Sequence, residues 1–120
     1  CKKKVKISEK VKDYIQRNLI NLPLFVKKEV KIPDPLVYIY EANGCESCSF
    51  KGYKGRTGIF EVLSMTEEIA DIILKNPLES LIFKAAQKQG MLTMAQEGVL
   101  KVIAGETTID EIARATTEEK

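Results

Sequence analysis

The residues best suited to chemistry in this chain are its three cysteines. Cys45 and Cys48 are separated by two residues, and Cys1 stands at the first position. A Cys-x-x-Cys turn points both sulfurs the same way, so the two thiolates can bind one metal ion, and Cys1 can add a third if the chain folds back. A structural zinc site takes four ligands and the chain has no histidine. The fourth ligand is therefore expected outside this sequence.

The same cysteine spacing has two other interpretations, a redox dithiol and a pair of inert thiols. A redox Cys-x-x-Cys follows a strand and opens a helix that lowers the thiol pKa. Here Gly52 and Gly55 follow instead, which favours a metal site and leaves both alternatives open. An odd number of cysteines fits a disulfide framework poorly and a reducing, intracellular compartment better.

A short basic loop follows the cysteines. Residues 51–56 read KGYKGR, so cations alternate with glycines around Tyr53. Charge combined with an aromatic ring is what single-stranded nucleic acid binders use, and protein interfaces and phosphate contacts use the same groups. The net charge of 19 − 17 = +2 is too small to indicate nucleic acid by itself.

Arg56 is the residue of this loop with the sharpest functional hypothesis. It lies just before an apolar segment, so its backbone is held while its guanidinium can reach outward. We expect Arg56, with Lys54 beside it, to pair with carboxylates or phosphates across an interface. The alternative is an internal salt bridge that ties the loop to Glu46 or Glu61.

No catalytic residue is predicted in this chain. It contains neither the Walker A pattern nor the G-x-G-x-x-G pattern. A Ser-His-Asp or Cys-His arrangement is excluded because histidine is absent. No apolar run approaches the roughly 20 residues of a membrane-spanning helix. The chain by itself is therefore not expected to be an enzyme.

The elements that must position these groups follow from periodicity and caps. A basic run at residues 2–6 is a strand or coil, Ser8 caps a helix, and 36–41 is a strand. A second short helix is expected at 24–30 and a buried strand at 59–63. Four short amphipathic helices are expected over 66–116, with capping pairs at Ser64/Glu67, Thr93/Gln96 and Thr108/Glu111 and breaks at Asn76-Pro77, Gly90 and Gly105.

Two stretches closely resemble the C-terminal end of the type II secretion and type IV pilus assembly ATPases. They are GCESC followed three residues later by GYKGRTGIFEVL, and QGMLTMAQEGVLKVIAGETTIDEIAR. The resemblance covers roughly residues 41–116 well, and 1–40 only through Cys1 and length. The chain begins with Cys1 rather than Met, so we expect a piece of a longer parent protein.

The resemblance implies an α+β fragment in two parts. Residues 1–52 would be a zinc-ribbon-like, tetracysteine-type lobe with a short β segment, holding zinc through Cys1, Cys45 and Cys48. Residues 53–120 would be the end of a RecA-like motor domain, a strand plus a small bundle of four short helices. The first Cys of the first pair is missing here, so the zinc shell is incomplete within this sequence.

The resemblance also implies what the parent does. The parent would be a cytoplasmic, homo-hexameric ATPase, peripheral at the inner membrane, with its ATP and magnesium sites upstream of Cys1. Its partners would be neighbouring subunits, the inner-membrane platform and cytoplasmic adaptor proteins. The fragment would brace the motor and present an interaction surface, with no nucleic acid expected. The alternative from the residues is a free-standing zinc-ribbon module that binds nucleic acid.

Overall fold

The computed structural model describes residues 1–20, 22, 23, 26, 32, 33 and 35–117 of the chain. The expected helix at 24–30 falls mostly outside these residues. The described elements are β1 (Lys2–Lys6), α1 (Glu9–Leu19), β2 (Tyr38–Ala42), the 3-10 turn η1 (Glu46–Cys48), α3 (Glu67–Lys75), α4 (Glu79–Lys88), α5 (Met94–Ile103) and α6 (Ile109–Thr117). None of the described helices is long and apolar enough to cross a membrane.

The two strands form an antiparallel ladder in which Lys2 lies opposite Ala42 and Val5 opposite Ile39. The strand expected at 36–41 is thus confirmed, with bounds Tyr38–Ala42, and the basic run at 2–6 is a strand. Only Ile39 of this ladder is buried, because the chain supplies a core on one side of the sheet. The lysine ammonium groups stay exposed, and that of Lys2 lies 4.5 Å from the centre of the Tyr40 ring.

One hydrophobic core joins α1, β2, α5 and α6. Its buried members are Ile15, Ile39, Val99, Val102 and Ile112. The first two precede the predicted boundary at residue 52 and the last three follow it. Residues from both predicted parts therefore contribute to one core.

The helix ends follow the caps read from the sequence, with one exception. The hydroxyls of Ser8 and Thr93 accept N–H bonds from the first turns of α1 and α5. Helix α3 is capped by Thr66 rather than by the expected Ser64. Thr66 is the residue directly before the first residue of α3, Glu67. The backbone of Ser64 instead exchanges hydrogen bonds with the side chain of Gln89, which directly follows α4.

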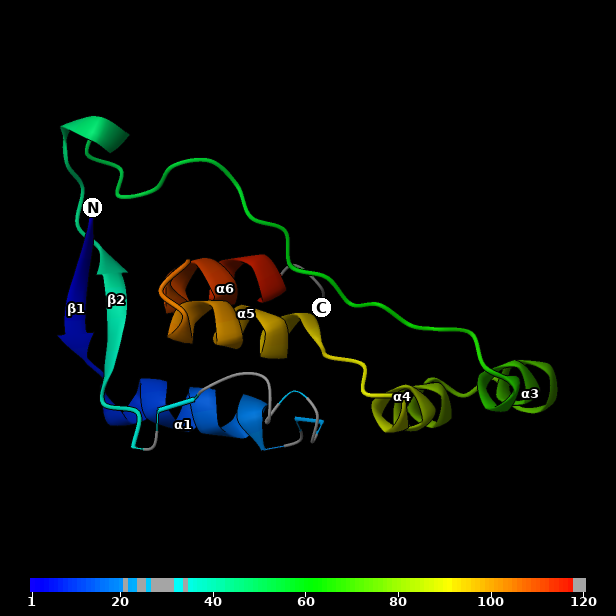
Figure 1. The fold of residues 1–120 in the computed structure, drawn as a ribbon. Coiled ribbons are helices and arrows are strands. Elements are labelled where there is room, and N and C mark those ends of the chain that lie inside the picture. Colours follow the sequence, from blue (N-terminus) through cyan, green and yellow to red (C-terminus); the bar gives the residue numbers. More distant parts are fainter. Residues whose placement is uncertain (21, 24–25, 27–31, 34, 118–120) are drawn as a thin grey trace.

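Helices α3 and α4 form a pair that lies to one side of the main body (Figure 1). Ile69 of α3 packs inward and is fully buried, and Ala85 and Ala86 of α4 are buried as well. Outside this small seam the pair leaves apolar side chains exposed, including Leu74 and Leu78. Two short helices bury little surface, which is why these side chains remain uncovered.

The expected strand at 59–63 does not form within this chain. The segment from Thr57 to Thr66 has no regular secondary structure and runs along the molecule as an extended connection (Figure 1). It is tied down by side chains instead: Glu97 accepts the N–H of Phe60, and Glu61 accepts the N–H of Met94. A strand needs a neighbouring strand for its backbone groups, and the described chain offers none at this place.

The shared core predicts the effect of shortening a side chain in α6. We expect Ile112→Ala to lower the free energy of unfolding by about 2–4 kcal/mol, because it leaves a cavity where a buried side chain packed against α5. Urea unfolding followed by circular dichroism at the helical band measures this.

Ile20→Ala is the matched control, since Ile20 is 70% exposed. It is expected to change the unfolding free energy by no more than about 0.5 kcal/mol. Equal effects of the two substitutions would contradict the placement of the core.

Candidate functional site

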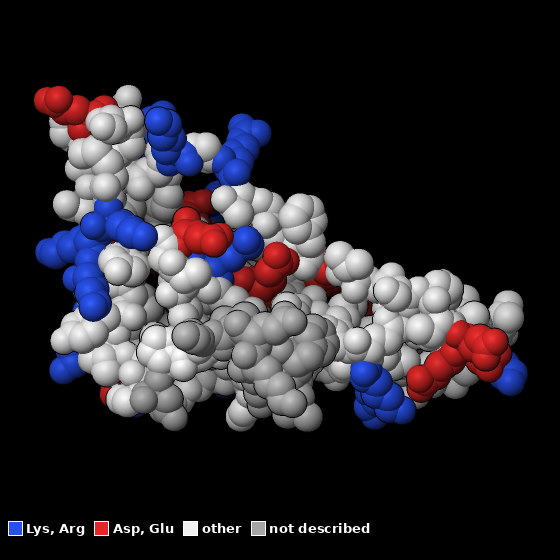
Figure 2. Space-filling model, viewed as in Figure 1, with Lys and Arg blue, Asp and Glu red and all other residues white. Residues whose placement is uncertain are grey.

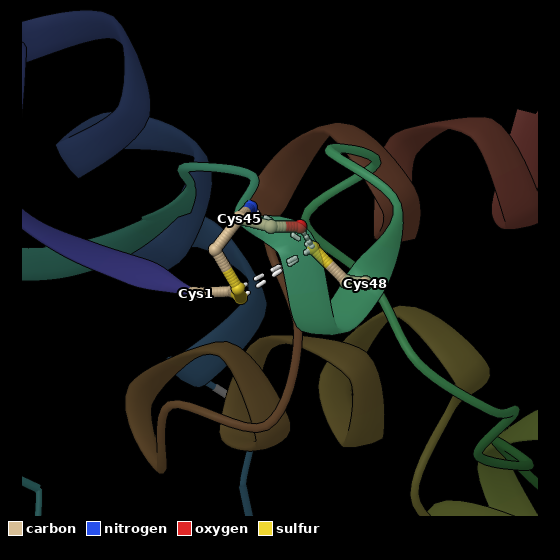
Figure 3. A group of neighbouring side chains, drawn as sticks. All are labelled: Cys1, Cys45 and Cys48. Carbon is tan, nitrogen blue, oxygen red and sulfur yellow. Dashed lines mark hydrogen bonds between the residues drawn. A yellow bond between two sulfur atoms is a disulfide. The ribbon is translucent and has the colours of Figure 1, made fainter.

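The β1–β2 ladder brings the three cysteines together at one end of the molecule. Cys1 precedes β1, and its carbonyl accepts the N–H of Asn43, just after β2. Cys45 directly precedes the η1 turn that follows β2, and Cys48 is the last residue of that turn. The fold-back expected from the sequence is thus achieved by strand pairing, and Figure 3 shows the three side chains pointing toward one another.

The sulfur atoms form a compact cluster. Those of Cys1, Cys45 and Cys48 all lie within 4.8 Å of one another. The Sγ of Cys48 is 3.4 Å from that of Cys1 and 3.9 Å from that of Cys45. Among the described residues, this is the one group of cysteines and carboxylates close enough to share a metal ion.

A disulfide joins Cys1 and Cys45, and Cys48 is a free thiol. This corrects the expectation that an odd number of cysteines argues against a disulfide. The ladder holds the two Cα atoms 5.7 Å apart, within the range that a disulfide spans. Cys1 and Cys45 therefore bind a metal only in their reduced, thiolate form.

Backbone hydrogen bonds converge on the sulfur of Cys48. It accepts the N–H groups of Cys45, at 3.2 Å, and of Gly52, at 3.1 Å. The bond from Cys45 is the main cause that lowers the pKa of the Cys48 thiol; burial opposes it, and the bonds from Gly52 and Phe50 add to it. Such N–H groups stabilise a thiolate, which is the form that acts as a metal ligand or a nucleophile.

Two glycines make the turn possible. A Cβ on Gly44 would lie 2.2 Å from the backbone oxygen of Phe50, so no larger residue fits there. Gly52 has a φ of +82°, and a Cβ there would also meet the side chain of Ala42. Both positions allow the chain to double back closely around the cysteines.

The basic loop is anchored at its aromatic residue. The hydroxyl of Tyr53 lies 2.7 Å from the hydroxyl of Thr108, which is only 8% exposed. The Thr108 oxygen also accepts the N–H of Glu111 in the first turn of α6, as its predicted capping pair requires. Sequence reasoning missed the Tyr53–Thr108 contact, because no local pattern links residues 55 positions apart.

Lys54 and Arg56 are exposed, and neither forms a hydrogen bond or ion pair with a described residue. The salt bridge offered as the alternative for Arg56 is therefore absent from the described chain. Glu61 bonds the backbone of α5 instead, and Glu46 lies in the η1 turn. Together with the exposed Lys51, the loop thus presents three cations to its surroundings.

Comparison of the sequence with known proteins identifies one family. The family model described as type II/IV secretion system protein matches residues 2–114. The chain belongs to this family. The match includes the cysteine turn, the basic loop and all but the last residues of α6.

Two relatives show how much of the family's length is present. The chain is 33% identical to the type IV pilus assembly ATPase PilB of Acinetobacter baylyi over 118 residues, which are 98% of this chain and 18% of that protein. It is 38% identical to the type II secretion system protein E of Dickeya dadantii over 81 residues, 68% of this chain and 16% of that protein. The chain thus spans less than a fifth of the length of these relatives.

The anchor of the loop can be tested by removing one oxygen atom. We expect Tyr53→Phe to lower the free energy of unfolding by about 1 kcal/mol, because the buried Thr108 hydroxyl loses a partner. Tyr38→Phe is the control, since the Tyr38 hydroxyl forms no hydrogen bond with a described residue. Urea unfolding of the two variants side by side checks this, and an equal effect of both would contradict the anchor.

Proposed function

We propose that the chain is the C-terminal part of a hexameric ATPase that powers type II secretion or type IV pilus assembly. The observation that carries this is the 33% identity to an ATPase named for pilus assembly over 98% of the chain. In this proposal, residues of the parent outside this chain hold ATP and magnesium. The parent is cytoplasmic and peripheral at the inner membrane, with adaptor proteins and the membrane platform as partners.

The work proposed for the fragment is to brace the motor and present a surface to its neighbours. Support comes from the extended segment, whose residues Phe60, Val62 and Met65 are each about two-thirds exposed or more. Several exposed large apolar groups in one short segment support a surface that another part of a protein covers. In this proposal the remainder of a RecA-like motor domain supplies that cover and pairs with the segment as a strand.

We also propose that the cysteine cluster holds a structural zinc ion in the parent. Four ligands about 2.3 Å from zinc stand about 3.8 Å apart in a tetrahedron. The two separations of the Cys48 sulfur, 3.4 and 3.9 Å, are close to that value. The three sulfurs fit a soft, tetrahedral ion once Cys1 and Cys45 are reduced, and the parent supplies the fourth ligand.

The zinc proposal is tested on reduced, full-length protein that carries this chain. We expect about one zinc per subunit by elemental analysis after extensive dialysis, and loss of that zinc in Cys48→Ala. Ser49→Gly is the control, because Ser49 has a φ of 51° that glycine adopts freely. A wild-type protein without zinc, or a Cys48→Ala variant that retains it, would sink this proposal.

Arg56 is proposed to act at the border between subunits. It is exposed and has no acidic partner within the described chain, so its guanidinium is available to a neighbour. Cations at such borders stabilise the charge that develops during phosphoryl transfer in the adjacent site.

The proposed ATPase and the role of Arg56 are tested together in the full-length hexamer. We expect Arg56→Ala to reduce ATP turnover on the order of a hundredfold while folding and zinc content stay unchanged. Lys84→Ala, an exposed lysine of α4, should turn over normally. If the full-length protein hydrolyses no ATP, the proposed function is wrong; if Arg56→Ala loses stability but turns over normally, Arg56 is structural.

A further inference from the structure

The basic loop forms one wall of a cavity of about 650 Å³. The second wall is the end of β2, at Tyr40, Glu41 and Ala42. The third is the corner between α5 and α6, which includes Thr108. The Tyr53–Thr108 hydrogen bond spans two of these walls, so the cavity is held open by a defined contact.

Most of the charges that line this cavity are already satisfied. Lys101 pairs with Glu106, and Arg114 pairs with Glu111. The ammonium of Lys2 bonds the carbonyl of Gly105. Among the described charged residues that line the cavity, Lys54, Arg56 and Glu41 remain without a side-chain hydrogen-bond or ion-pair partner.

Lys54 and Arg56 both line the cavity and both are exposed to solvent. Figure 2 shows Lys and Arg gathered at this end of the molecule, over β1 and the loop. The cationic side chains that line the cavity outnumber the acidic ones: Lys2, Lys54, Arg56, Lys101 and Arg114 against Glu41, Glu106 and Glu111. The cavity therefore sits in a positive field and attracts a ligand that carries negative groups.

The walls also say which kind of negative ligand fits. Glu41, Glu106 and Glu111 line the same cavity, so a continuous row of phosphates would meet carboxylates at short range. Small-molecule sites of this volume are mostly apolar, whereas charged side chains from the loop, from β2 and from the α5–α6 corner all line this cavity. A polypeptide segment, with carboxylates for the loop cations and backbone N–H groups for the wall carboxylates, matches both signs of charge.

We propose that this cavity binds an acidic segment of a partner protein, with side-chain carboxylates on Lys54 and Arg56. The guanidinium accepts a carboxylate in a two-point contact, and the ammonium of Lys54 adds a second charge nearby. This proposal is separate from the phosphoryl-transfer role proposed for Arg56, because it names a carboxylate as the group that the guanidinium meets. Its test needs no ATP turnover, so the two proposals fail separately.

The test measures binding of a fluorescein-labelled 12-residue peptide of alternating Glu and Ser to the whole chain, by fluorescence anisotropy. We expect saturable binding that weakens about tenfold in Arg56→Ala and about tenfold in Lys54→Ala, because each loses a charge-assisted contact. Lys84→Ala, an exposed lysine on α4 outside the cavity, should bind as the wild type does. Circular dichroism confirms that all variants are folded.

Two competitors distinguish other polyanions from an acidic peptide. Polyuridylate and vesicles containing phosphatidylglycerol are titrated against the same labelled complex. Weak competition by both supports the peptide, since the wall carboxylates repel them. The proposal is overturned if the peptide does not bind, if Lys84→Ala weakens binding as much as Arg56→Ala, or if either competitor binds more tightly than the peptide in an Arg56-dependent way.

Discussion

The antiparallel ladder between β1 and β2 is the constraint on which the site depends. The ladder places the end of β2 beside Cys1, so that the Cys1 sulfur lies next to those of Cys45 and Cys48. Ile39 fastens the ladder to Val99 and Val102 of α5 in the shared core. The position of the cysteines is therefore set by hydrophobic packing on a helix that begins about fifty residues later in the chain, and not by the turn alone.

The same packing explains why the basic loop has a defined place although it has no secondary structure. At its start, the N–H of Gly52 is bound by the Cys48 sulfur. One residue later, the Tyr53 hydroxyl is bound to Thr108 at the start of α6. These two hydrogen bonds fix the beginning of the loop. Lys54 and Arg56, which follow, remain unpaired within the described chain. The cysteine cluster and the loop are thus connected directly through Gly52.

In the extended segment and the α3–α4 pair, by contrast, several apolar side chains find no partner within the described chain and stay exposed. The caps and apolar spacing of α3 are sufficient to form the helix, and Ile69 finds a fully buried place. Phe60 and Val62 find no such place and remain largely exposed. The matched residues make up only 18% and 16% of the two relatives, which agrees with the proposal that other residues cover this surface.

What the sequence determined by itself is the set of local features. Helices α1 and α5 begin after Ser8 and Thr93. In each case the side-chain oxygen accepts the backbone N–H three residues later, which has no acceptor within the helix. The spacing of Cys45 and Cys48 places two sulfurs on one turn for the same local reason. Family membership also follows from the sequence, since residue identity at fixed spacing carries it.

Only the tertiary structure decided the long-range features. Strand pairing brought Cys1 to Cys45, and one core took residues from both sides of residue 52. The segment at 59–63 has strand-like side chains but remained unpaired, because a strand requires a neighbour that no local pattern can supply. Arg56 was left without Glu46 or Glu61 for the same physical reason: whether two charges meet depends on where the whole chain places them, and not on their types.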